Sequence, residues 1–205
     1  MQKALLAVDR LSTWMGQLFA WTIVGLTFMI SGEVFSRYVL GVPHAWMFDV
    51  QIMLYGTLFM MAGAYTLSKN GHVRGDVLYG FFRPRTQAAL DLLLYIVFFL
   101  PGVVALTWAG WIYFQDALAI REQTFNAMPL PLYPFKFVIP MAGALLLLQG
   151  LVEIARCVIC LRQGQWPSRE QDVEEVDVEK LKAMVGADKD AAMAASPAER
   201  GGGPL

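Results

Sequence analysis

The chain has 205 residues, of which 57% are hydrophobic and only 16% are charged. An ordinary soluble domain carries about 25% charged residues, so this chain has too few to cover a surface that faces water. The formal net charge is −1, and no basic stripe with interleaved aromatic residues points to nucleic-acid binding. We therefore expect a membrane protein that binds no nucleic acid.

Four stretches of the sequence are long and apolar enough, or nearly so, to cross a bilayer, which takes about 20 residues of helix. The expected spans are about 11–36, 46–68, 88–115 and 134–161. The fourth reaches spanning length only if Lys136 extends its charged end outward to the interface. Strands are excluded because an open sheet in lipid leaves backbone groups unpaired. The expected fold class is an all-α integral membrane protein with four transmembrane helices.

A cleavable signal peptide is the alternative interpretation of the first stretch, because Lys3 and Arg10 precede it. Leu11–Gly32 carries no charge, however, and is longer than the about 7–15 apolar residues of a signal peptide. We expect a retained first span.

Lysine and arginine residues near the ends of the spans predict the orientation, because they favour the cytoplasmic side. One side collects Lys3, Arg10, Lys69, Arg74, Arg83, Arg85, Arg156, Arg162 and Arg169. The other side collects only Arg37, Arg121 and Lys136. Both termini and the middle loop are therefore expected in the cytoplasm.

The composition changes after Gly164, which divides the chain into an expected membrane domain over 1–164 and an acidic cytoplasmic tail over 165–205. Asp172–Val185 has apolar residues near helical spacing, consistent with a short surface helix. From Gly186 onward the Ala, Asp, Ser, Pro and Gly content predicts disorder.

Small residues recur seven positions apart in every span and predict close helix packing. The pairs are Gly25/Gly32, Gly56/Gly63, Gly102/Ala109 and Gly143/Gly150. Pro101 lies well inside the third span. Since proline removes a backbone hydrogen bond, we expect a kink there.

The sequence motifs of soluble enzymes are absent: there is no phosphate-binding glycine loop, nucleophile elbow or metal-binding histidine pair. His44 and His72 are expected on opposite sides of the membrane, so they could not ligate one haem. Cys157 and Cys160 have no second pair for a metal site. They are expected to be small buried side chains, with a redox role as the alternative. We expect no catalysis, cofactor or metal.

Glu33 and Arg37 are spaced as an i,i+4 pair at the outer end of the first span. Three interpretations remain open: an internal ion pair, a polar anchor against a partner subunit, and a titrating transport carboxylate. Asp49 opens the second span, where it would complement the helix dipole or help to dock an external partner.

The expected cytoplasmic loop alternates His72, Arg74 and Asp76 before the apolar stretch 77–82. Positive-inside anchoring explains its basic residues but not this alternation. The apolar stretch is typical of a segment that lies on the membrane or against another subunit.

Three motifs in order resemble the small membrane subunits of tripartite ATP-independent periplasmic (TRAP) transporters, the DctQ-like proteins. The first is Glu33-Val-Phe-Ser-Arg37-Tyr38 with Pro43, Trp46 and an acid opening the second span. The second is Gly63-Ala-Tyr65 followed by His72-Val-Arg74-Gly-Asp76, and the third is Ile139-Pro140 with Gly143 and Leu148-Gln149. The resemblance covers roughly residues 10–160. Asp49 stands where the family often has Glu, and Gly75 where it often has an apolar residue.

The resemblance implies a multi-pass protein of the bacterial inner membrane with two protein partners, a large TRAP membrane subunit and a periplasmic solute-binding protein, among membrane lipids. The small subunit would be a scaffold in cation-coupled uptake of an organic acid. Candidate subunit-interface or structural polar residues are Glu33, Arg37, Trp46, Asp49, His72, Arg74, Asp76 and Gln149. The alternatives are an independent proton-coupled exporter that uses Glu33, and a membrane assembly factor without a transport role.

Overall fold

The computed structural model describes residues 2–69 and 82–167. These residues belong to the first of two compact units, Met1–Gln171. The expectations for His72, Arg74, Asp76 and the apolar stretch 77–82 lie almost wholly outside the described residues. So do those for the tail beyond residue 167.

The first span is one long helix with two local irregularities. It consists of α1 (Gln2–Ala20), α2 (Thr22–Phe35) and the π-helical turn η1 (Ser36–Leu40). At Trp21 the backbone N–H reaches the carbonyl of Leu18, three residues back, at 3.3 Å. Gly41 ends the helix in the left-handed conformation with φ 70°, which costs glycine little because it has no Cβ.

The second and third spans are α3 (Ala45–Ser68) and a second composite helix. That helix runs through α5 (Pro84–Leu94), the π-helical turn η2 (Tyr95–Phe99) and α6 (Leu100–Ala119). Pro84 stands in the first turn of α5, where the missing N–H of proline is not needed. The fourth span follows as α7 (Tyr133–Lys136) and α8 (Val138–Gln163).

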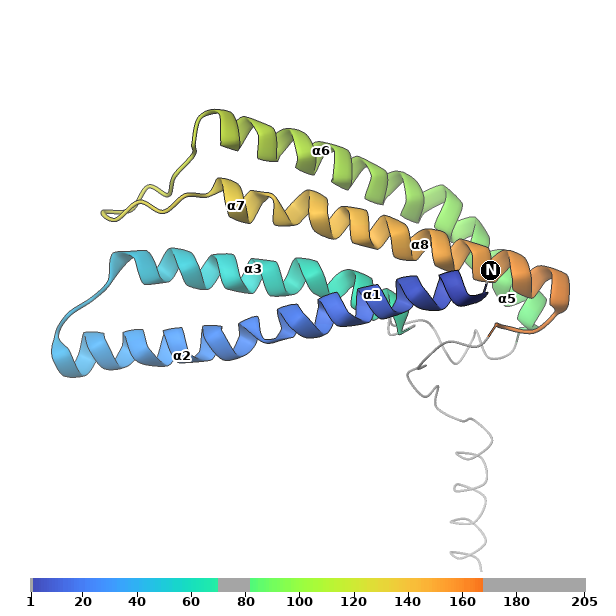
Figure 1. Ribbon diagram of the computed structural model, residues 1–205, viewed down its shortest axis with the longest axis horizontal. Coiled ribbons are helices and arrows are strands. Elements are labelled where there is room, and N and C mark those ends of the chain that lie inside the picture. Colours follow the sequence, from blue (N-terminus) through green and yellow to red (C-terminus); the bar gives the residue numbers. More distant parts are fainter. Residues whose placement is uncertain (1, 70–81, 168–205) are drawn as a thin grey trace, which may run out of the picture. The chain divides into compact units, whose positions relative to one another are not determined.

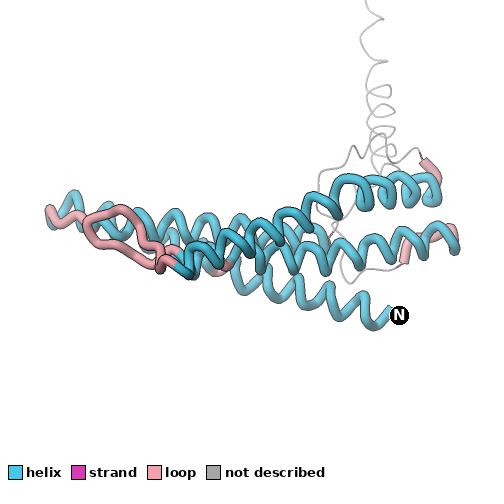
Figure 2. Tube along the Cα trace, turned by 90° about the horizontal axis from the view of Figure 1, so that it is seen from above, coloured by secondary structure: helices cyan, strands magenta, loops and turns pink. Residues whose placement is uncertain are grey.

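The helices form two hairpins packed through α3 and α8 (Figure 1). One hairpin joins α1 and α2 to α3, and the other joins α5 and α6 to α8. Figure 2 shows the loop between α6 and α7 at one end of these helices, with the N-terminus at the other. Residues Gln123 and Pro131 pair across this loop as an isolated antiparallel bridge.

The expectation of four membrane-spanning helices is confirmed. Four helices are long and apolar enough to cross a membrane: Lys3–Leu40, Ala45–Ser68, Pro84–Ala119 and Tyr133–Gln163. No strand occurs among the described residues. The first and third helices are longer than the expected spans, since polar residues at their ends continue the helix beyond the apolar stretch.

The backbone irregularity expected at Pro101 takes the form of a π-helical turn. The N–H of Leu100 reaches back five residues to the carbonyl of Tyr95. This widened turn lies directly before Pro101, whose ring would otherwise clash with the carbonyl four residues earlier. The helix therefore continues through the proline.

The glycine pairs divide into those that pack and those that do not. An added Cβ on Gly143 would lie 2.4 Å from Thr107 Oγ1, and one on Gly150 would lie 2.2 Å from a ring carbon of Phe99. Gly56 likewise lies against Phe135. A Cβ on Gly25, Gly32 or Gly102 would meet nothing within 4 Å. The glycines of α8 thus allow close packing against α6 and η2 within the second hairpin. Gly56 of α3 allows close packing between the two hairpins.

Replacement of Gly143 by valine should destabilise the bundle by about 1–3 kcal/mol, because the new side chain would also press on the Thr107 backbone. Gly25→Val is the matched control, since that position opens on free space. Thermal unfolding of the purified chain in detergent measures both. Equal losses for the two variants would contradict the packing assigned to α6 and α8.

Candidate functional site

A first polar cluster joins the end of the first span to the start of α3. Glu33 Oε1 accepts hydrogen bonds from Arg37 Nη2 at 2.9 Å and Arg37 Nε at 3.3 Å. The same oxygen accepts the backbone N–H of His44 at 3.1 Å. His44 Nδ1 lies 3.1 Å from Glu33 Oε2, so Nδ1 carries the proton in this contact. The Glu33 side chain is only 8% exposed.

This geometry supports an internal role for Glu33. Both carboxylate oxygens of Glu33 have hydrogen-bond partners. The partners are Arg37, one turn later in the same helix, and His44, the residue that precedes α3. Such a carboxylate fixes the short connection between the two helices, because a buried charge must be paired and hydrogen-bonded. Trp46 packs edge-on against the His44 ring, with ring centroids 6.3 Å apart.

Asp49 lies one turn further into α3 than the helix-dipole interpretation assumes, because the first turn of α3 contains no acidic residue. Its Oδ2 is shielded from solvent and accepts no hydrogen bond within the described part of the chain. The structure places Asp49 on the same helix as Trp46 but does not bring it into the Glu33 cluster.

A second polar cluster closes the loop between α6 and α8. The ammonium group of Lys136 forms an ion pair with Glu122 and lies 3.7 Å from the centroid of the Tyr113 ring. Lys136 is 6% exposed. The loop supplies a carboxylate and α6 an aromatic face that hold the charge of Lys136 at this end of the fourth span, and its extension to the membrane interface stays a prediction.

A third and larger polar cluster ties α1 to α8. Gln149 accepts a hydrogen bond from Ser12 Oγ at 2.9 Å and donates one to Asp9 Oδ1 at 2.9 Å. Arg156 donates to Glu153 Oε1 at 2.9 Å and forms an ion pair with Asp9. All five side chains are at most 3% exposed.

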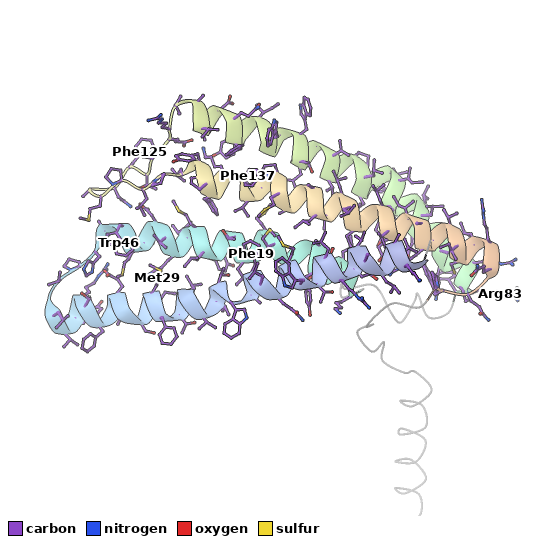
Figure 3. All side chains as sticks on the ribbon, in the orientation of Figure 1. Phe19, Met29, Trp46, Arg83, Phe125 and Phe137 are labelled. Atoms are coloured by element: carbon purple, nitrogen blue, oxygen red, sulfur yellow. The ribbon has the colours of Figure 1, made fainter. Side chains whose placement is uncertain are left out.

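The third cluster lies at the opposite end of the hydrocarbon from Lys136. At 1.5 Å per residue, Gln149 is about 20 Å and Arg156 about 30 Å further along α8 than Lys136. The hydrocarbon core of a bilayer is about 30 Å thick. Figure 3 shows Trp46 and Phe125 at one end of the helices and Arg83 at the other. Lys136 and Arg156 are thus separated by about the thickness of the apolar layer, whereas Gln149 lies about two-thirds of the way across it.

Three threonine hydroxyl groups along the spans bond within their own helices. Thr27, Thr57 and Thr107 each donate to the carbonyl four residues earlier, at 2.8, 2.7 and 2.7 Å. Such bonds leave no donor directed at a solute. Among the described residues, no group of three or more His, Cys, Asp or Glu side chains is placed to hold a metal ion.

The two cysteines lie on α8, where both are buried and neither forms a disulfide. Cys160 Sγ lies 3.6 Å from the carbonyl oxygen of Pro84, and Trp166 donates to Gln87 Oε1 at 3.2 Å. These contacts attach the end of α8 to the start of α5. The geometry is that of packing side chains, as the first interpretation of the cysteines expected.

Sequence reasoning found the Glu33–Arg37 spacing but not the other polar partners. The i,i+4 rule gives Arg37, whereas His44 is reached only through the turn geometry after Gly41. Gln149, Glu153 and Arg156 lie four and three residues apart on α8, a repeat that places them on one helix face. This spacing is the feature of the sequence from which the α8 side of the third cluster could have been predicted.

Arg156→Ala should destabilise the bundle by about 3–5 kcal/mol, because it would leave Asp9 and Glu153 buried without their cation. Arg162→Ala is the matched control on the same helix, where the arginine is exposed. Asp9→Ala combined with Arg156→Ala should cost less than the sum of the single losses. Additive losses in detergent unfolding would contradict the pairing.

Comparison with known proteins identifies the family. The model for the "Tripartite ATP-independent periplasmic transporters, DctQ component" matches residues 23–160. A search of curated proteins returns no match. The matched range contains the Glu33 cluster, the Lys136 cluster, and Gln149, Glu153 and Arg156 of the third cluster. The chain is a multi-pass membrane protein that belongs to the DctQ family, the small membrane components of TRAP transporters.

Proposed function

We propose that this chain is the fixed scaffold subunit in a TRAP transporter of the bacterial inner membrane. Its partners are the large membrane subunit, which moves the substrate, and the periplasmic solute-binding protein that delivers it. The transported substrate is an organic acid, and a cation gradient drives uptake. The cation, the substrate and the partners are features of this proposal, which builds on membership of the family.

The observation that supports the scaffold role best is the position of the charged clusters. The charged pairs of the three clusters lie towards the ends of the spans, and each cluster joins two segments of the chain. A transport site instead lies near the midplane, commonly at broken helices whose exposed backbone binds the substrate or ion. The irregularities at Trp21 and Tyr95–Phe99 are flanked by exposed apolar side chains, which offer no ligands for an anion.

The exporter alternative requires Glu33 to exchange a proton with water during transport. Glutamine is the discriminating replacement because it keeps the shape and one acceptor oxygen but does not titrate. In Glu33→Gln the side-chain oxygen could still accept from Arg37 and the His44 backbone, and the new amide could donate to the His44 ring. The scaffold proposal therefore tolerates this change, and the exporter alternative does not.

Glu33→Gln should retain most cation-driven uptake in proteoliposomes that hold this chain, the large subunit and the binding protein. Glu33→Ala should weaken co-purification with the large subunit, by about 1–2 kcal/mol for a lost intramembrane polar contact. Both are measured at matched protein levels. Abolished uptake with Glu33→Gln in an intact complex would overturn the scaffold proposal in favour of a titrating carboxylate. Uptake by this chain alone would do the same.

In the proposed topology, the span ends that carry most of the lysine and arginine residues lie in the cytoplasm, together with both termini. Single cysteines introduced at Pro43 and Phe125, in an otherwise cysteine-free chain, should react with a membrane-impermeant thiol reagent added to the periplasmic side. A cysteine at Arg83 should react only after the inner membrane is opened. Periplasmic labelling at Arg83 would refute the four-span arrangement proposed here.

A further inference from the structure

A groove borders the outer side of the Glu33 cluster, between the first helix and α3. Its volume is about 220 Å³. Ile30, Val34 and Phe48 supply apolar walls, and Arg37, Tyr38 and Gln51 supply polar groups. All three apolar side chains are exposed, so the groove opens on the surroundings of the bundle and not on its interior.

The polar groups of the groove keep donors that the chain does not use. Arg37 binds Glu33 through Nε and Nη2, which leaves Nη1 without a partner among the described residues. Its side chain is 52% exposed. Tyr38 and Gln51 make no side-chain hydrogen bond within the described part of the chain. Glu33 also borders the groove, but its oxygens are occupied by Arg37 and His44.

These groups follow a gradient of polarity along the helix axis. Arg37 and Tyr38 lie in the last turn of the first helix, near the membrane surface. Gln51 lies deeper, about 9 Å from the start of α3 at 1.5 Å per residue. Val34 and Ile30 continue the groove away from the loop, one and two turns before Tyr38. From outside to inside, the guanidinium and the phenol come first, beside Phe48; the amide follows, beside Val34; and Ile30 lies deepest.

This order matches the chemistry of a glycerophospholipid: a phosphodiester outermost, ester carbonyls below it, and acyl chains below those. An arginine fork is well suited to phosphate oxygens, and basic pockets between membrane helices are known to hold lipid headgroups. A carboxylate from a partner subunit would satisfy Arg37 but would leave the Gln51 amide and the apolar wall below it unfilled.

We propose that the groove between α2–η1 and α3 binds one glycerophospholipid from the leaflet at that end of the bundle. The phosphodiester contacts Arg37 Nη1 and the Tyr38 hydroxyl, an ester carbonyl accepts from the Gln51 amide, and an acyl chain lies along Ile30 and Val34. Because Arg37 and Glu33 together carry no net charge, the phosphodiester is the recognised group. Zwitterionic and anionic headgroups both fit it.

Native mass spectrometry of the full chain, alone and with its large subunit, tests the site with three probes that share acyl chains. The probes are phosphatidylethanolamine, phosphatidylglycerol and diacylglycerol. Both phospholipids should be retained at one molecule per chain, and diacylglycerol about ten-fold more weakly, since it lacks the charge-assisted bonds. Retention of only one of the two phospholipids would show which headgroup the site accepts and would still support a site for the phosphodiester.

Arg37→Ala should reduce phospholipid retention about ten-fold. Tyr38→Phe and Gln51→Leu should each reduce it about three-fold. They keep the test valid if Arg37→Ala disturbs folding, because neither side chain bonds to another of the described residues. Phe28→Ala is the control, since Phe28 is exposed on α2 and does not border the groove.

Retention that is unchanged in all three groove variants would overturn the proposal, as would equal retention of diacylglycerol. Loss of the lipid when the large subunit is added would indicate that a side chain of that subunit occupies the groove, and this result would also overturn the proposal. The measurement involves no transport, so its failure leaves the scaffold proposal standing, and failure of uptake leaves the lipid site standing.

Discussion

The bundle depends on one constraint: a charged group at the edge of hydrocarbon must find its partner inside the protein. Along the fourth span, Lys136 at the end of α7 and Arg156 on α8 stand about 30 Å apart at 1.5 Å per residue, which is the thickness of the apolar layer. Each is almost fully buried and each binds a carboxylate from another segment, Glu122 or Asp9. These two pairs fix the depth of α8 and attach the loop and α1 to it.

Between these levels the helices pack through small side chains. Gly143 and Gly150 on α8 lie against Thr107 and Phe99, while the threonine hydroxyls bond within their own helices. Lipid tails are as apolar as the helix surfaces, so close backbone approach contributes much of the stability here. Close packing in the middle with polar pairs towards both ends agrees with the scaffold role proposed above.

The four spans could be predicted from hydropathy alone, because length and apolar composition determine what crosses a bilayer. The polar contacts could be predicted only where partners are close in sequence, as for Glu33 and Arg37. Asp9 and Arg156 are 147 positions apart, and no local rule pairs them. The partner of Lys136 escaped prediction for the same reason: Glu122 comes from a loop whose path, with Thr124 bonded to Leu130, the sequence did not reveal. Pro101 predicted a kink, and the structure has a π-helical turn directly before it.

The contacts of Glu33 also bear on the choice between scaffold and carrier. A carboxylate that carries protons must be exposed to water in at least one state and must lose some of its partners when it is protonated. Glu33 receives four contacts, two from Arg37 and two from His44, one of which is a backbone N–H at the residue before α3. Protonation would weaken all four and loosen the connection between the first two spans. Keeping Glu33 charged therefore preserves the bundle, whereas a carrier would have to disturb it in every cycle. This favours a fixed ion pair with a structural role.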